Sequence, residues 1–132
     1  MIEFINPPDV GTRPTPFSRA TRAGGFVFVS GHSAPHDPAH GRPRGETAQE
    51  QVRQALATLA RILEAAGSGL DRVVQVTMLI SDPADYDACN EEYLKHFPHG
   101  LPARHTARFG VPTDAKVAFA CIALAGEDAE RR

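Results

Sequence analysis

The chain has 132 residues, which is enough for one domain and too few for two. Hydrophobic residues make up 42% and charged residues 23%, with no long uncharged apolar run, which excludes a disordered tail protein and a membrane-spanning segment. Fourteen Lys and Arg against sixteen Asp and Glu give a net charge of -2, so no dedicated nucleic-acid binder is expected. We therefore expect one soluble globular domain with no nucleic-acid or membrane partner.

Neither an export signal nor a disulfide framework is expected. Residues 1–6 are acidic and are followed by Pro7 and Pro8, whereas an export signal has a basic start and then a longer apolar stretch. Cys89 and Cys121 each lie in an apolar periodic segment, which is typical of reduced thiols packed in a core. These features indicate a cytoplasmic protein.

The first part of the chain predicts a β-hairpin and a long loop. Two short runs, 17–22 and 26–30, are separated by the segment 23–25, whose two glycines suit a turn that needs positive φ. A loop rich in Pro and Gly follows over 31–46. It is long for a connector, which suggests a functional role.

Two helices are predicted. Thr47 and Glu50 have capping-box spacing, and apolar residues then recur at the helical interval until Gly67 ends the run. Asp82 as N-cap and Pro83 at the first helical position open the second helix, which ends before Pro98 and Gly100. Its expected buried stripe consists of Tyr86, Cys89, Tyr93, Leu94 and Phe97.

Three further strands are predicted, over 73–80, 104–109 and 116–124, which gives the order β-β-α-β-α-β-β. Right-handed crossovers place both helices on the same face of a mixed sheet. The segments 26–30, 73–80 and 116–124 are apolar on both sides. The uncovered face would therefore expose an apolar patch larger than a soluble monomer usually exposes. We therefore expect a homo-oligomer that packs through that face. The charged segment 126–132 is predicted to be frayed.

Arg104 is the first candidate binding residue. It lies at the start of a predicted strand, just after Pro102, and alternation places Thr106 and Arg108 on the same side. Its guanidinium can offer a planar, two-pronged donor to a carboxylate, and an ordinary surface ion pair is the alternative. His105 is expected to point to the opposite side of the strand.

Three histidines at intervals of four, His32, His36 and His40, raise the question of a metal site. Pro35 and Pro38 exclude the helix that would align them, and no cysteine lies near. We expect no metal there and interpret the segment as a solvated loop. No glycine-rich phosphate loop or nucleophile elbow occurs, so no cofactor is expected.

Four motifs, taken in order, resemble the RidA (YjgF) family of reactive-intermediate imine deaminases, some of which carry the older label L-PSP endoribonuclease. The segment 15–20 resembles the family's Gly-Pro-Tyr-Ser-Gln-Ala entry, and 28–32 resembles its strand that ends in Ser-Gly. The segment 86–93 resembles its second-helix Asn pattern, and 101–104 resembles its Pro-Ala-Arg signature. The correspondence covers about 15–124.

The resemblance implies an α+β, chorismate-mutase-like (YjgF) fold: a mixed β-sheet with two helices on one face, assembled as a homotrimer with three sites between subunits. It implies that Arg104 anchors the carboxylate of a 2-imino or 2-enamino acid. Gly31 and Phe17 are expected to line the pocket, with Asn90 in the same neighbourhood. Hydrolysis of such a substrate releases ammonia and a 2-keto acid.

The chain departs from the family pattern at the position expected to activate water. Ala120 stands where the resemblance places a glutamate, Thr106 replaces the Cys that often follows the arginine by two, and Phe17 replaces the pocket tyrosine. His32, expected at the mouth of the pocket, is a candidate substitute proton carrier. Cys121 is interpreted as small core filling.

Two functions therefore stay open. The first is a deaminase-like hydrolase of small 2-imino or 2-enamino carboxylates, with Arg104 as anchor. The second is a non-catalytic trimeric binder of small carboxylates such as keto acids, which the missing glutamate favours. Ribonuclease activity has only the family's older label behind it, and the charge balance opposes it.

Overall fold

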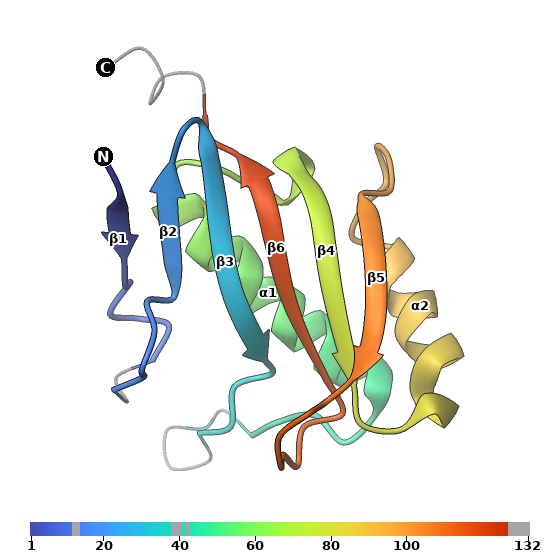
Figure 1. Ribbon diagram of the computed structural model, residues 1–132. Coiled ribbons are helices and arrows are strands. Elements are labelled where there is room, and N and C mark those ends of the chain that lie inside the picture. The colour runs from blue at the N-terminus through green and yellow to red at the C-terminus, as the bar shows by residue number, and fades with distance from the viewer. Residues whose placement is uncertain (12–13, 38–40, 42, 127–132) are drawn as a thin grey trace.

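The computed structural model describes residues 1–11, 14–37, 41 and 43–126, and within them six strands form one mixed sheet with two α-helices on one face (Figure 1). The sheet order is β1-β2-β3-β6-β4-β5; β4 and β5 are parallel and the other neighbours are antiparallel. The strands are β1 Glu3–Ile5, β2 Ala20–Ala23, β3 Phe26–Ser33, β4 Val73–Ile80, β5 Ala103–Arg108 and β6 Val117–Leu124. The helices are α1 Ala48–Ala65 and α2 Tyr86–Leu94, with short 3-10 turns at Leu70–Arg72 and Pro83–Asp85.

The predicted order of elements is confirmed, with one strand added. The strand β1 pairs with β2 at the edge of the sheet, although the sequence predicts no element there. Three residues are too few to show an alternating pattern. No helix of the described residues is long and apolar enough to cross a membrane.

The hairpin turn is tighter than predicted. Ala23 pairs with Phe26, so the turn consists of Gly24 and Gly25 alone, with φ of 58° and 84°. These values belong to the left-handed region that two-residue hairpin turns require. The strand β3 continues to Ser33, so the first residues of the expected 31–46 loop are strand instead.

The predicted capping of α1 is confirmed, whereas Asp82 caps the 3-10 turn before α2 and the N-cap of α2 itself is Asp85. The Thr47 hydroxyl accepts a hydrogen bond from the Glu50 amide at 3.1 Å, and the Asp82 carboxylate accepts one from the Ala84 amide at 2.9 Å. Asp82 caps a short 3-10 turn that leads into α2. The stripe of α1 that packs on the sheet is fully buried: Val52, Ala55, Leu56, Leu59, Ile62 and Leu63.

The buried stripe predicted for α2 is wrong at two positions. Cys89 and Tyr93 are buried, whereas Tyr86 is 41% and Leu94 53% exposed, and Glu92 is buried instead. The reason is that α2 lies over the β4–β5 end of the sheet (Figure 1), where the sheet ends and cannot cover the whole helix.

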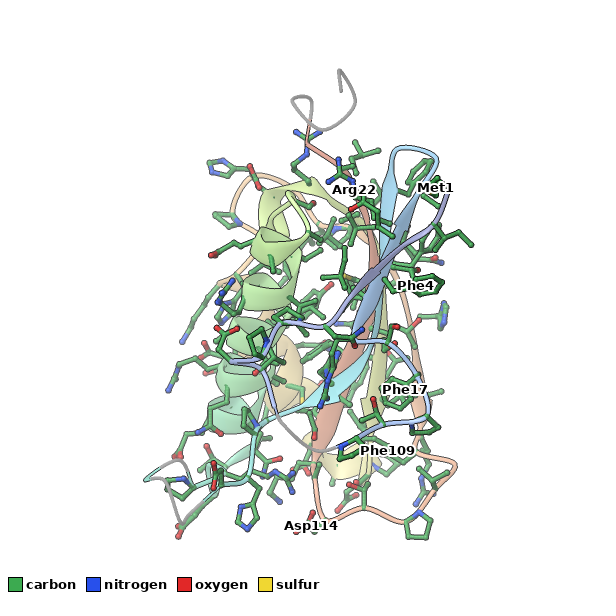
Figure 2. All side chains as sticks on the ribbon, turned by 90° about the vertical axis from the view of Figure 1, so that its left-hand side faces the viewer. Met1, Phe4, Phe17, Arg22, Phe109 and Asp114 are labelled. Atoms are coloured by element: carbon green, nitrogen blue, oxygen red, sulfur yellow. The ribbon has the colours of Figure 1, made fainter. Side chains whose placement is uncertain are left out.

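The sheet face without helices is apolar and exposed in the single chain, as predicted. Large side chains on it are about two-fifths exposed: Phe26, Phe28, Val74 and Leu124. Seen edge-on, the helices lie on one side of the sheet and Phe4 and Phe17 project from the other (Figure 2). We call this the open face. Cys89 and Cys121 are free and buried on the helix side, which confirms that both pack in the core.

Candidate functional site

Arg104 lies on the edge strand β5 and points to the helix side of the sheet. Its partner in the parallel register is Val76, which is fully buried under the helices. The guanidinium carbon lies 4.8 Å from the ring centroid of Tyr93 and 5.8 Å from that of Tyr86. Its Nη2 atom donates a hydrogen bond to the Tyr86 hydroxyl at 3.2 Å. Two aromatic rings thus hold the cation by cation–π contact and a hydrogen bond.

Arg104 does not form the ordinary ion pair, its alternative role, with any residue that the structure describes. Among the described residues, no carboxylate lies within 4.0 Å of its guanidinium. The nearby Asp85 is instead 3.9 Å from the ammonium of Lys116. Arg104 therefore keeps donors available for an external anion.

Asn90 belongs to the same cluster. It is four residues after Tyr86 and three before Tyr93, so all three side chains lie on one face of α2. The Asn90 Oδ1 and Tyr93 Oη atoms are buried and have no hydrogen-bond partner among the described residues. Burial, with the charge of Asp85, raises the pKa of the Cys89 thiol to about 11, so this thiol is no nucleophile.

Ala120 and Gly31 lie together on the open face. Ala120 is in the middle of β6, with Thr77 of β4 as its partner. On its other side the β3 register shifts between Val29 and His32, so that Ser30 and Gly31 both oppose Ala120 as a β-bulge. A Cβ atom built on Gly31 would meet nothing within 4 Å, so the space beside it is open.

Phe17 precedes β2 and is 46% exposed on the open face (Figure 2). The Ser30 hydroxyl donates a hydrogen bond to the Ser18 carbonyl at 2.7 Å, which ties this segment to the bulge. A surface hollow beside Phe17 is lined by residues 6–7, 11 and 14–19 and does not include Arg104.

The expected position of His32 at a pocket mouth is wrong. Its partner on β6 is the buried Phe119, so the imidazole lies on the helix side, only 6% exposed. Plain alternation from Val29 would place His32 on the open face, but the bulge adds one residue and reverses its side. Its Nε2 lies 3.4 Å from the Arg19 carbonyl, and burial lowers the pKa of this imidazole.

No metal site forms among the described residues, which hold no group of three His, Cys, Asp or Glu side chains that could bind an ion. His36 accepts a hydrogen bond from the Arg44 amide at 3.5 Å, and His40 lies outside the described residues. His105 lies on the open face, as predicted. Its Nε2 is 2.9 Å from the Thr77 hydroxyl, a pairing that alternation within a largely apolar strand does not reveal.

The candidate residues thus form two groups that one chain does not bring together. Arg104 and Asn90 lie on the helix side at the β5 edge, whereas Phe17, Gly31 and Ala120 lie on the open face. Three strand spacings, roughly 14 Å, separate β5 from β3. A small ligand of one chain therefore contacts one group or the other.

The fold and site define a class of small α+β protein: a mixed sheet with two helices on one face and an unpaired arginine held at the sheet edge. The sequence profile described as "Endoribonuclease L-PSP" matches residues 11–125. The chain belongs to this family, which is the RidA (YjgF) family that the motifs predicted.

Individual relatives and a solved structure support this family assignment. The chain is 38% identical over 113 residues to the "RutC family protein UK114" of Drosophila melanogaster, covering 84% of this chain and 80% of that protein. It is 37% identical over 109 residues to "Reactive Intermediate Deaminase A, chloroplastic" of Arabidopsis thaliana, covering 82% of this chain but only 58% of that protein. A crystal structure titled a putative endoribonuclease L-PSP, from Entamoeba histolytica, is 31% identical, with a TM-score of 0.83 and coverage of 94% and 99%. One relative is named chloroplastic and another mitochondrial, so the cytoplasmic location stays a prediction.

Proposed function

We propose that the protein hydrolyses small 2-imino or 2-enamino carboxylates to ammonia and a 2-keto acid. The observation that carries the proposal is Arg104, a half-buried guanidinium that has no carboxylate partner among the described residues and is held by two aromatic rings. Such a group suits the carboxylate of a small ligand. The name of the Arabidopsis relative, a reactive intermediate deaminase, supports the same chemistry.

The two groups of site residues favour a site shared between copies of the chain. Arg104 and Asn90 of one copy would meet Phe17, Gly31 and Ala120 of a second, with the exposed phenylalanines of the open face buried between copies. In the family this assembly is a homotrimer. The apolar character of the open face supports such packing.

The alternative is a trimeric binder of keto acids without catalysis, and one observation favours it. Ala120 supplies no acid or base at the position where the resemblance places a glutamate. Losing a general acid or base typically costs on the order of a hundredfold to ten-thousandfold in rate. Because imines hydrolyse readily in water, a site that only orients its substrate can still give turnover.

Ammonia release separates the two functions. An amino-acid oxidase generates the 2-imino acid in place, and ammonia is followed with wild type, Arg104→Ala and Arg108→Ala. Arg108 is the matched control, because it lies on the same strand and donates a hydrogen bond to the Ser81 carbonyl at 3.5 Å, away from Tyr86. We expect wild type and Arg108→Ala to accelerate release and Arg104→Ala to lose both turnover and keto-acid affinity. Equal rates for wild type and Arg104→Ala, with keto-acid binding intact in wild type, would instead establish the binder.

A further inference from the structure

The open face carries a hydrogen-bonded pair of polar side chains on neighbouring strands, a histidine and a threonine. His105 Nε2 and Thr77 Oγ1 lie 2.9 Å apart on neighbouring strands. We propose that the Thr77 hydroxyl, backed by His105, carries protons to and from a substrate bound on the open face. The proposal rests on the proposed function and adds to it the proton carrier that an arginine anchor cannot supply.

The register places this pair in line with Ala120 and Gly31. One row across the sheet runs from His105 on β5 through Thr77 on β4 to Ala120 on β6, and the bulge at Gly31 lies next on β3. Side chains directly opposite on antiparallel strands lie about 4.5–5.5 Å apart at Cβ. The Thr77 hydroxyl therefore stands beside the short Ala120 methyl, which leaves room for a ligand above it.

His105 is the ionisable side chain of this row of described residues. Arg104 and Arg108, its neighbours along β5, point to the opposite face. Among the described residues, the open-face side chains that β4 and β6 place around it are uncharged: Gln75, Thr77, Leu79, Ala118, Ala120 and Ile122. Histidine is the side chain that ordinarily exchanges protons between pH 5 and 8.

The buried His32 cannot act as the proton carrier on the open face. It lies on the helix side of the sheet at 6% exposure, whereas His105 is exposed. A proton carrier has to come within hydrogen-bond reach of the reacting atoms, either directly or through one water. Beside Ala120 on the open face, the Thr77 hydroxyl with its histidine partner meets that condition, whereas the Ser30 hydroxyl donates its proton to the Ser18 carbonyl.

The proton balance of hydrolysis fits this pair. Water adds to the imine carbon, a C–O bond forms, and the C=N electron pair moves to nitrogen. The Thr77 hydroxyl passes one proton from the water to His105 and returns one to the nitrogen. This gives a carbinolamine, and the pair moves a second proton in the same way, from the carbinolamine hydroxyl to its nitrogen. The C–N bond then breaks, ammonia leaves, and the carbonyl of the 2-keto acid forms. Imine and water become ketone and ammonia, so nothing is oxidised or reduced and the pair ends in its starting state.

The test compares kcat/KM for ammonia release from pH 5.5 to 8.5 in wild type, His105→Gln, Thr77→Val and Thr77→Ser. Thr77→Val keeps the shape without the hydroxyl, and Thr77→Ser restores the hydroxyl. The matched control is His99→Gln, because His99 is exposed on the loop after α2. Keto-acid affinity and the melting temperature are measured for each variant.

We expect His105→Gln and Thr77→Val to lose on the order of a hundredfold in kcat/KM. His105→Gln should also flatten the pH profile. Thr77→Ser should restore most of the rate that Thr77→Val loses, His99→Gln should keep the wild-type rate, and keto-acid affinity should change less than twofold in each variant. A His105→Gln rate and pH profile equal to those of wild type overturns the proton carrier and leaves the proposed function intact. A wild type no faster than Arg104→Ala overturns both.

Discussion

The Arg104 guanidinium donates a hydrogen bond to the Tyr86 hydroxyl at 3.2 Å while its carbon lies 4.8 Å from the Tyr93 ring centroid. The two tyrosines thus hold the cation in different ways. Tyr86 orients the guanidinium through a hydrogen bond, whereas the Tyr93 ring contacts the guanidinium through a cation–π interaction. This difference gives the two hydroxyls different expected effects on ligand affinity.

Tyr86→Phe should weaken binding of a 2-keto acid about fivefold, because a hydrogen bond to a charged group that contributes about 1 kcal/mol is lost. Tyr93→Phe is the matched control. The Tyr93 hydroxyl is buried without a hydrogen-bond partner among the described residues, so its removal should leave affinity within twofold and should not lower the melting temperature. Titration calorimetry and thermal unfolding measure both effects. Equal losses of affinity in the two variants would contradict a positioning role for Tyr86.

Ala120→Glu should increase the rate of ammonia release at least tenfold, because it places a carboxylate beside the Thr77 hydroxyl on the open face. Ala107→Glu is the control, since Ala107 is exposed and lies on the same face next to Leu79, two residues further along β5 than His105. Initial rates are compared at equal saturation with the 2-imino acid, and gel filtration checks that both variants assemble as wild type does. Equal rates for Ala120→Glu and wild type would count against Ala120 as the position next to the reacting atoms.

Alternation and capping signals predict most of the fold, because each reflects a local requirement. Thr47 with Glu50 and the apolar run of α1 are examples, and the bare sheet face follows from strands that are apolar on both sides. The bulge at Ser30 and Gly31 has no comparable signal. It depends on the register with β6, a strand almost ninety residues away in the chain, and it alone moves His32 from one face to the other.

The candidate site is predictable only in part for the same reason. Short motifs identify Arg104 and Asn90 as candidates, and the structure places both on the helix side of the sheet. The pairing of Thr77 with His105 depends on parallel strand register, which neither strand encodes by itself. The exposure of Tyr86 likewise depends on where the sheet ends beneath α2.

Phe28→Asp should break the proposed homo-oligomer into monomers, because it replaces one of the large apolar side chains whose burial between copies would hold the open faces together. Phe28 is 42% exposed in the single chain and pairs with Ile122 on β6. Leu94→Asp is the control: Leu94 is 53% exposed but lies on α2, on the other side of the sheet. Light scattering after gel filtration gives the mass of each variant. Dissociation of both variants, or of neither, would contradict assembly through the open face.

Glu92 should make the fold sensitive to acid below about pH 4.5. Its buried carboxylate accepts a hydrogen bond from His96 at 2.9 Å and ion-pairs with Arg53 at 3.3 Å and Lys95 at 3.4 Å. The hydrogen bond from His96 and the two cations lower the pKa of this carboxyl to about 2, against the opposing effect of burial. Since the unfolded pKa is higher, the stabilisation is complete above about pH 4.5 and is lost as the pH falls towards 2.

Glu92→Gln should therefore be less stable than wild type at pH 7, by on the order of 1–3 kcal/mol, and the difference should shrink between pH 4.5 and 2. Urea unfolding at several pH values measures it. Glu91→Gln is the matched control, because Glu91 is exposed on the same helix and should leave stability within about 0.5 kcal/mol of wild type. A constant difference between wild type and Glu92→Gln from pH 7 to 2 would show that the carboxylate charge does not stabilise the fold.

Protonation of His32 should destabilise the fold at a higher pH than protonation of Glu92 does. Burial is the main cause that lowers its pKa below the ordinary 6.5, and the nearby Arg19 charge acts in the same direction. The unfolded chain therefore binds a proton more readily than the folded one, so stability is full above about pH 6.5 and falls as the pH drops through the folded pKa. His32→Gln should remove this loss of stability between pH 6.5 and 5, where Glu92 stays ionised, and the control His99→Gln should show the same loss as wild type.

His32→Gln should also keep the wild-type rate of ammonia release, since the imidazole lies on the side of the sheet away from Ala120. Urea unfolding and the ammonia assay on the same preparations decide both points, and a hundredfold slower His32→Gln with unchanged stability would return the proton-carrying role to His32.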